Sequence, residues 1–417
     1  MNPFFPVING EMHAEGVPLS AIAAQFGTPC YVYSKAALVA AYQDFGRAFA
    51  GRDHLICYAM KANSNLAILN LFAKLGAGFD IVSGGELARV QAAGGDTTKV
   101  VFSGVGKSVV EIQAALQAGI KCFNVESASE LERINQVAGE LKKVAPISFR
   151  VNPNVDAKTH PYISTGLKDN KFGVAYEDAL PLYRKAHAMP NVKIKGIDYH
   201  IGSTVTEIAP FAEAFEKVLD LVDKLEAEGI AISHIDIGGG VGIRYKDETP
   251  PTIAEYAARL LKLLGTRKHT ILMEPGRALV GSAGVLLTRV EYLKHHESRN
   301  FAIVDAAMND LIRPSLYQAY HEIVATKASA AAKQTYDIVG PICESSDFLG
   351  HGRTLALQEG DLLTVMAAGA YGSSMSSNYN TRGRGAEVMV DGKNLHLIAQ
   401  RETSAQTFAR EKLLPDA

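Results

Sequence analysis

The feature that most constrains the fold is a regular alternation of short apolar runs and amphipathic stretches between residues 55 and 276. The runs are continuously apolar, which is typical of strands buried on both faces of a parallel sheet. In the stretches between them, such as 83–94 and 211–229, apolar residues recur at helical spacing. The apolar runs lie at 55–60, 79–83, 99–104, 121–127, 147–152, 194–202, 234–240 and 269–276.

Eight strand–helix units in a segment of this length predict an α/β fold, a (β/α)8 TIM-like barrel, over residues 38–282. After about residue 282 the runs remain strand-like but lose the long helices between them, and Asp391-Gly392 predicts a hairpin. We therefore expect a mostly antiparallel C-terminal β domain over 283–417. The first 37 residues do not fit the barrel rhythm, so we assign them to the β domain.

Composition excludes several classes of protein. The formal charge is −2, so the chain has no basic excess for nucleic acid. No run approaches the roughly 18 apolar residues of a membrane span, and the N-terminus does not have the pattern of a signal peptide. The four cysteines, Cys30, Cys57, Cys122 and Cys343, are scattered without a paired motif. They predict free thiols in a cytoplasmic protein, with neither a disulfide framework nor a metal site.

Polar residues gather where the predicted barrel strands end, which is where barrel enzymes carry their catalytic groups. Each has an ordinary explanation as well. A strand-end lysine usually just enters water, a lone histidine is usually packed, and a triple glycine is usually a turn. Their coincidence at one end of one barrel favours a site. The candidates are Lys61, Asp80, Arg150, His200, Ser203, the glycines 238–240, Glu274, Gly276 and Arg277.

This set suits pyridoxal 5'-phosphate. A lysine in a dry pocket has a lowered pKa and forms a Schiff base with a carbonyl. Gly239 and Gly240 let backbone N–H groups approach a phosphate. Glu274 suits the ring nitrogen, because a carboxylate favours its protonated form. His200 is placed to lie against the ring face. These expectations explain why a buried apolar run stops at Lys61.

The chain also resembles the fold-type III pyridoxal phosphate-dependent decarboxylases, which share the alanine racemase-like fold, and among them those acting on diaminopimelate. The resemblance covers almost the whole chain, in the family's order. It is carried by the stretches YAMKAN (58–63), DIVSGGEL (80–87), HIGS (200–203), GGG (238–240), EPGR (274–277), RPSLY (313–317), CESSD (343–347) and GAYG (369–372).

The resemblance implies decarboxylation of meso-2,6-diaminopimelate to L-lysine, the last step of lysine biosynthesis. It implies that Lys61 carries the cofactor and that Cys343 donates the proton after CO2 leaves. It further implies a homodimer whose active sites are shared across the interface. Tyr371 is expected beside the phosphate together with Ser203, Gly239, Gly240 and the 274–277 turn. The substrate contacts expected are Arg277, Arg313, Tyr317, Glu344 and Tyr371.

Other assignments remain open at this point. The chain could decarboxylate another diamino acid, such as carboxynorspermidine, ornithine or arginine, although those acting on a distal cation alone carry aspartate where Glu344 stands. A silent regulatory relative should lack Lys61 or Cys343, and Cys343 could be only a small buried hydrophobe. Thr204, Asn170 and Gly383 depart from the family's usual pattern, which bears on selectivity.

Overall fold

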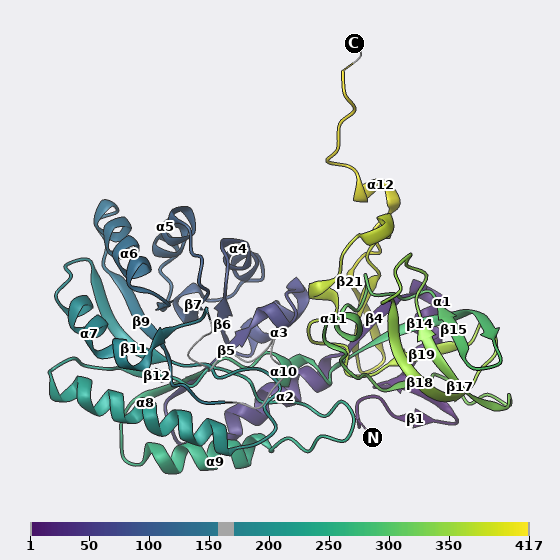
Figure 1. The fold of residues 1–417 in the computed structure, drawn as a ribbon, viewed down its shortest axis with the longest axis horizontal. Helices are drawn as coiled ribbons and strands as arrows, with labels where there is room; N and C mark the ends of the chain where they lie inside the picture. Colours follow the sequence, from purple (N-terminus) through teal and green to yellow (C-terminus); the bar gives the residue numbers. More distant parts are fainter. Residues whose placement is uncertain (1, 157–170, 416–417) are drawn as a thin grey trace. The chain divides into compact units, whose positions relative to one another are not determined.

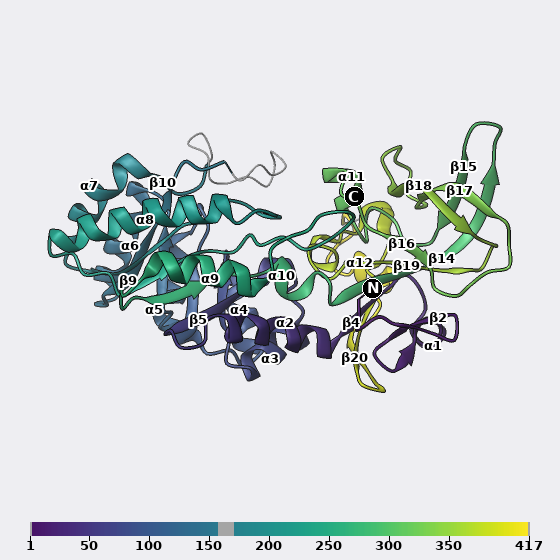
Figure 2. The same cartoon turned by 90° about the horizontal axis from the view of Figure 1, so that it is seen from below.

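The computed structural model describes residues 2–156 and 171–415, so the departure at Asn170 lies outside the described residues. The chain forms two compact units. The barrel unit comprises residues 39–244 and 248–279, and the β unit comprises 1–38, 245–247 and 280–417. Figures 1 and 2 show the elements of both units in two views.

The barrel unit contains the eight predicted strands, all parallel. They run in the order β9-β11-β12-β13-β5-β6-β7-β8, and β8 pairs back with β9, which closes the barrel. A two-residue strand, β10 (Val174–Ala175), adds to β9. The barrel strands are β5 (His54–Ala59), β6 (Gly78–Ile81), β7 (Val100–Phe102), β8 (Cys122–Val125), β9 (Ala145–Asn152), β11 (Val192–Asp198), β12 (His234–Asp236) and β13 (Thr270–Met273).

Helices cover the outside of this barrel (Figure 1). Several begin at a side-chain cap directly after a strand: Ser83 accepts from the backbone N–H of Glu86, and Ser127 from that of Glu130. Such caps make the helix start immediately where the strand ends. The helices are α2 (Lys35–Ala48), α3 (Leu66–Lys74), α4 (Gly84–Ala92), α5 (Val109–Ala118), α6 (Ala128–Glu140), α7 (Tyr176–His187), α8 (Ala209–Ala227), α9 (Ile253–Leu264) and α10 (Arg277–Val280).

The β unit is built on a sheet in the order β18-β17-β15-β14-β4-β20-β21, with β19 pairing β14 and β16. Its other elements are short. The strands are β4 (Cys30–Ser34), β14 (Gly284–His295), β15 (Asn300–Val304), β16 (Ile323–Ala325), β17 (Lys333–Val339), β18 (Phe348–Ala356), β19 (Leu362–Val365), β20 (Ala386–Asp391) and β21 (Asn394–Ala399), with β1 (Val7–Ile8), β2 (Glu11–Ala14), β3 (Val17–Pro18), α1 (Leu19–Phe26), α11 (Arg313–Tyr317) and α12 (Ser404–Thr407) beside them.

Strand β4 confirms that the N-terminal segment joins the β unit. It lies between β14, to which it is antiparallel, and β20, to which it is parallel. A second parallel pair, β15 with β17, makes the sheet mixed although most pairs are antiparallel. The predicted hairpin is present: β20 and β21 pair around Gly392, whose φ of +64° is favourable for glycine.

Candidate active site

Lys61 lies just past the end of strand β5, in a short 3-10 turn over Met60–Ala62. Its Nζ donates to Asp80 Oδ2 at 2.8 Å, and the Asp80 side chain is fully buried at the end of β6. The Lys61 side chain is 39% exposed. Because its ammonium is held by a buried carboxylate, the turn directs the amine toward the strand ends rather than simply into water.

The triple glycine after β12 is required by close packing of the backbone. Gly238 and Gly240 have φ values of +63° and +108°. A Cβ on Gly239 would lie 2.2 Å from the carbonyl oxygen of Glu274, and one on Gly240 2.3 Å from that of Gly202. No other residue fits this glycine cradle, residues 238–240, without moving the backbone. Within it, the N–H of Gly238 donates to Asp236 Oδ1 and holds the turn against the end of β12.

His200 follows β11 and is fixed in one protonation state by its neighbour. Its Nδ1 accepts from the backbone N–H of Gly239 at 3.2 Å, which requires a lone pair on that nitrogen. Burial, together with the positive charges of Arg150 and Lys61, holds the pKa of His200 well below its usual value. The imidazole is therefore neutral, with its proton on Nε2.

Arg277 and Ser203 meet at the same end of the barrel. Arg277 is buried at the start of α10, and its Nε and Nη2 lie 3.3 and 3.1 Å from Ser203 Oγ. Gly276, just before it, packs against the β5 end: a Cβ there would lie 3.1 Å from the Ala59 carbonyl oxygen. The turn 274–277 is thereby seated directly beside the turn that carries Lys61.

A cluster of buried carboxyl groups underlies these residues. One carboxylate oxygen from each of Asp198, Asp236 and Glu274 lies within 4.8 Å of the others. Burial, with mutual repulsion, raises the pKa of Glu274 and of Asp198 well above the usual value, and burial raises that of Asp236 to about 7. Such a trio can also hold a metal ion. Burial and mutual repulsion favour protons shared within the cluster, and the Lys61 and Arg150 cations offset this rise in pKa in part.

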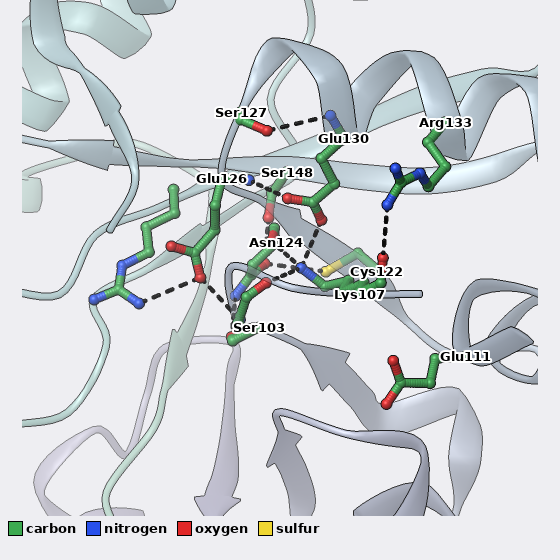
Figure 3. A network of polar contacts seen from close by, with 12 residues as sticks. Ser103, Lys107, Glu111, Cys122, Asn124, Glu126, Ser127, Glu130, Arg133 and Ser148 are labelled. Carbon is green, nitrogen blue, oxygen red and sulfur yellow. Dashed lines mark hydrogen bonds and ion pairs between the residues drawn. The ribbon is translucent and has the colours of Figure 1, made fainter. Parts of the chain in front are cut away.

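Hydrogen bonds from two further strand ends fix the Glu274 carboxylate. Its Oε1 lies 3.3 Å from Asn124 Nδ2 and 3.4 Å from Ser103 Oγ, and Ser148 in turn donates to Asn124 Oδ1. Figure 3 shows Ser103, Asn124 and Ser148 lying close together. These three residues were not predicted from the sequence, and neither were Asp198 and Asp236. For Ser103, Asn124, Asp198 and Asp236 the one available signal was a place at or near the end of a barrel strand, whereas Ser148 lies in the middle of β9 and carries no such signal.

The remaining candidates lie in the β unit. Helix α11 carries Arg313, which is buried, and Tyr317, which is partly buried. Tyr371 is partly buried and has a φ of +55°, in the left-handed region that non-glycine residues rarely adopt. These three are far apart in sequence from the barrel residues, and the structure shows them within their own unit.

Cys343 and Glu344 lie in the exposed loop between β17 and β18. The backbone N–H of Cys343 donates to Asn380 Oδ1 at 3.0 Å, and Glu344 Oε2 accepts from Tyr379 Oη at 3.2 Å. The alternative that Cys343 is a small buried hydrophobe is therefore wrong.

The barrel residues fit pyridoxal phosphate as a set. The glycine cradle is a tight turn in which an added Cβ would meet backbone carbonyl oxygens, and its lack of side chains suits close approach by a phosphate. Among the residues that the structure describes, the buried atoms Asp80 Oδ1 and Asp236 Oδ2 have no hydrogen-bond partner, so these two carboxyl groups can respond to a positive group. Lys61 provides an amine beside them. The donor set therefore suits a cofactor with an anionic end, a basic ring and a reactive carbonyl.

Residues 35–281 match the family described as pyridoxal-dependent decarboxylase, pyridoxal binding domain. The fold and the site thus define a pyridoxal phosphate-dependent decarboxylase. Among curated relatives, diaminopimelate decarboxylase of Vibrio cholerae is 58% identical over 98% of each chain. That of Neisseria meningitidis serogroup B is 59% identical over 96% of this chain and 97% of the relative. The chain belongs to the diaminopimelate decarboxylase family.

Solved structures agree with this assignment. Diaminopimelate decarboxylase of M. jannaschii, in co-complex with L-lysine, superposes with a TM-score of 0.95 at 41% identity and covers 99% of both chains. The Helicobacter pylori enzyme complexed with L-lysine gives a TM-score of 0.91 at 42% identity, covering 94% of this chain and 98% of that one. The fold extends over the β unit as well as the barrel.

Proposed function

We propose that this protein decarboxylates meso-2,6-diaminopimelate to L-lysine and CO2, using pyridoxal 5'-phosphate, as the last step of lysine biosynthesis. The observation that carries the proposal is the juxtaposition of Lys61, the glycine cradle and the buried Glu274 at one end of a closed barrel. Family membership over nearly the full length of the chain supports the same reaction.

Each barrel residue has a definite part in this proposal. Pyridoxal phosphate, when bound, supplies the electron-withdrawing ring that accepts the electrons released with CO2. Lys61 would hold it through its amine, and the turn that carries Gly239 and Gly240 would lie against its phosphate. Glu274 would hold the ring nitrogen, whose positive charge would favour the ionised carboxylate that burial alone disfavours. The neutral His200 packs against the ring without adding a charge.

Further cofactor contacts are assigned to four other residues. Ser203, Gly276 and Arg277 would line the phosphate end, and Tyr371 is assigned to the phosphate from the family resemblance. Asp80 pairs with the Lys61 ammonium and would hold the amine at the cofactor site. Arg150 is buried, with its Nη1 lying 3.6 Å from Glu126 Oε1, and supplies positive charge near His200.

Substrate choice rests on the far end of meso-diaminopimelate, which carries an ammonium and a carboxylate. Arg277, Arg313 and Tyr317 donate hydrogen bonds to the distal carboxylate, since guanidinium groups suit bidentate contacts. Glu344 accepts from the distal ammonium. Cys343 Sγ delivers a proton to the carbon that has lost CO2.

We also propose a cytoplasmic homodimer with active sites shared between subunits. Cys343 and Glu344 support sharing, because both lie on an exposed loop although the reaction needs them in a dry site. All four cysteines are free thiols, as expected in a reducing compartment. Among residues 2–156 and 171–415, no helix is both long and apolar enough to cross a membrane.

The test combines a spectrum with an assay of CO2 release. The purified protein should be yellow, and borohydride should attach the cofactor irreversibly to Lys61, as peptide mapping would show. Meso-diaminopimelate should release CO2 far faster than ornithine, arginine or carboxynorspermidine. Lys61→Ala should abolish both results, whereas Lys74→Ala, at an exposed lysine, should change neither. A folded protein that stays colourless with added cofactor would contradict the proposal.

A further inference from the structure

His321, which no motif singled out, is fully buried between α11 and β16 in the β unit. Both of its ring nitrogens are engaged. Nδ1 lies 2.9 Å from the carbonyl oxygen of Met366, and Nε2 lies 2.7 Å from Arg313 Nη1. The ring therefore joins the end of strand β19 to the arginine on helix α11.

These contacts define the protonation state of His321. A carbonyl oxygen can only accept a hydrogen bond, so Nδ1 carries the proton. A guanidinium can only donate, so Nε2 must offer a lone pair to Arg313. A doubly protonated ring would set N–H against N–H and place two positive charges 2.7 Å apart. The geometry requires the neutral ring with its proton on Nδ1.

The surroundings hold both side chains in place. The Arg313 guanidinium lies over the ring of Tyr245 at 4.6 Å, and Tyr245 also meets the His321 ring edge-on at 5.2 Å. The backbone carbonyl of His321 accepts from Arg353 Nη2 at 2.9 Å. Pairing of β16 with β19 fixes the Met366 carbonyl that orients the imidazole.

We propose that His321 is a positioning residue for substrate recognition, acting through Arg313; this rests on the proposed role of Arg313 in binding the distal carboxylate. The imidazole accepts one N–H of the guanidinium and Tyr245 packs against its face, so the orientation of the guanidinium is fixed before substrate arrives. A preorganised guanidinium loses less side-chain freedom on binding a carboxylate. His321 thereby sets affinity for the distal end of the substrate without touching it.

The experiment compares His321→Gln with His321→Asn in the holoenzyme. A Gln carbonyl reaches the position of Nε2 and can accept from Arg313, whereas the shorter Asn amide reproduces only the Nδ1 contact. We expect His321→Asn to raise KM for meso-diaminopimelate about 10- to 100-fold, as loss of a charge-assisted hydrogen bond implies, with kcat changed less. His321→Gln should stay within about threefold of the parent. His295→Gln, at an exposed histidine of β14, is the control.

Arg313→Ala separates this inference from the proposed function. If Arg313→Ala leaves KM unchanged, the distal-carboxylate role falls, and the role of His321 falls with it. If Arg313→Ala raises KM and His321→Asn, combined with it, adds nothing further, the two residues act as one unit. Equal KM values for His321→Asn and His321→Gln, or additive effects with Arg313→Ala, would overturn the positioning role. Melting temperatures of the single variants identify any general loss of stability.

Discussion

Among single residues, Glu344 is the one on which substrate choice depends in our proposal. It is exposed, and the hydrogen bond from Tyr379 Oη is its side-chain contact in the structure. That hydrogen bond raises the pKa of Tyr379, since the phenol is a better partner for the carboxylate than the phenolate would be. A side chain so lightly held contributes little to folding, so its substitution tests chemistry with little interference from stability.

Glu344→Gln should lower kcat/KM for meso-diaminopimelate by about 30- to 1,000-fold. The reason is loss of a charged contact to the distal ammonium, worth roughly 2–4 kcal/mol. Steady-state kinetics would measure the loss, and the cofactor spectrum and melting temperature should match the parent. Glu297→Gln, at another exposed glutamate of the β unit, is the matched control. Unchanged kinetics in folded Glu344→Gln would remove the distal-ammonium role.

Asp236 makes the stability of the cofactor-free protein depend on pH. Its pKa is about 7 in the folded protein, against about 3.9 in an unfolded chain. The folded state therefore binds the extra proton between these values. This proton stabilises the folded state by on the order of a few kcal/mol. The stabilisation is fully present below about pH 4 and is lost as pH rises through 7.

Asp236→Asn should flatten this dependence, because an amide keeps the acceptor for the Gly238 N–H without a titrating proton. Melting temperatures of the cofactor-free parent and variant, measured from pH 4 to pH 8, give the comparison. The parent should lose more stability than the variant over that range. Parallel curves would show that Asp236 does not hold the proton.

Among elements, the ends of β7 and β8 are joined by a buried lysine. Lys107 Nζ donates to the carbonyl oxygens of Gly104 and Asn124 at 2.9 and 2.8 Å, and to Glu130 Oε1 at 2.7 Å. All three ammonium protons are used, as Figure 3 shows. Because Ser103 and Asn124 stand at these strand ends, Lys107 indirectly holds the two donors to Glu274.

Lys107→Met should destabilise the barrel by about 3–5 kcal/mol, since it leaves the Glu130 carboxylate buried without its partner. Chemical denaturation of the cofactor-bound protein would measure the loss. Lys107→Met combined with Glu130→Leu removes both charges and should recover a large part of it. A single variant as stable as the parent would show that the ion pair contributes nothing to holding β7 and β8 together.

For the molecule as a whole, the question is which chain completes each site. The barrel unit carries Lys61, and the β unit carries Cys343 on an exposed loop. In a two-fold symmetric dimer each barrel would receive that loop from the partner chain, giving two equivalent sites. Dimerisation would then be required for activity and would not merely accompany it.

Mixing Lys61→Ala with Cys343→Ala tests this arrangement. Each variant alone should be inactive. After subunit exchange, half the dimers are hybrids, and each hybrid regains one intact site of two, so about a quarter of parental activity should return. Activity is assayed once the extent of subunit exchange has been measured, and analytical sedimentation establishes that the protein is a dimer. No recovery despite exchange would mean that each chain completes its own site.

Local sequence patterns were enough to predict the barrel strands and part of the candidate site. Continuous apolar runs predicted all eight barrel strands, because strands buried on both faces must be apolar throughout. Strand-end position selected Lys61, His200 and Glu274, because parallel strands bring their carboxyl ends to one rim. The hairpin at Gly392 could also be predicted from a local signal, since glycine adopts a positive φ with little strain.

Tertiary structure decided what depends on contacts between distant segments. The mixed sheet, with β4 between β14 and β20, follows from pairing across some 250 to 350 residues, which no local pattern encodes. The carboxyl cluster and its raised pKa values arise only when three separate strand ends exclude water together. The contact between His321 and Arg313 likewise depends on the tertiary structure, since the sequence around a single histidine does not show which group it will contact.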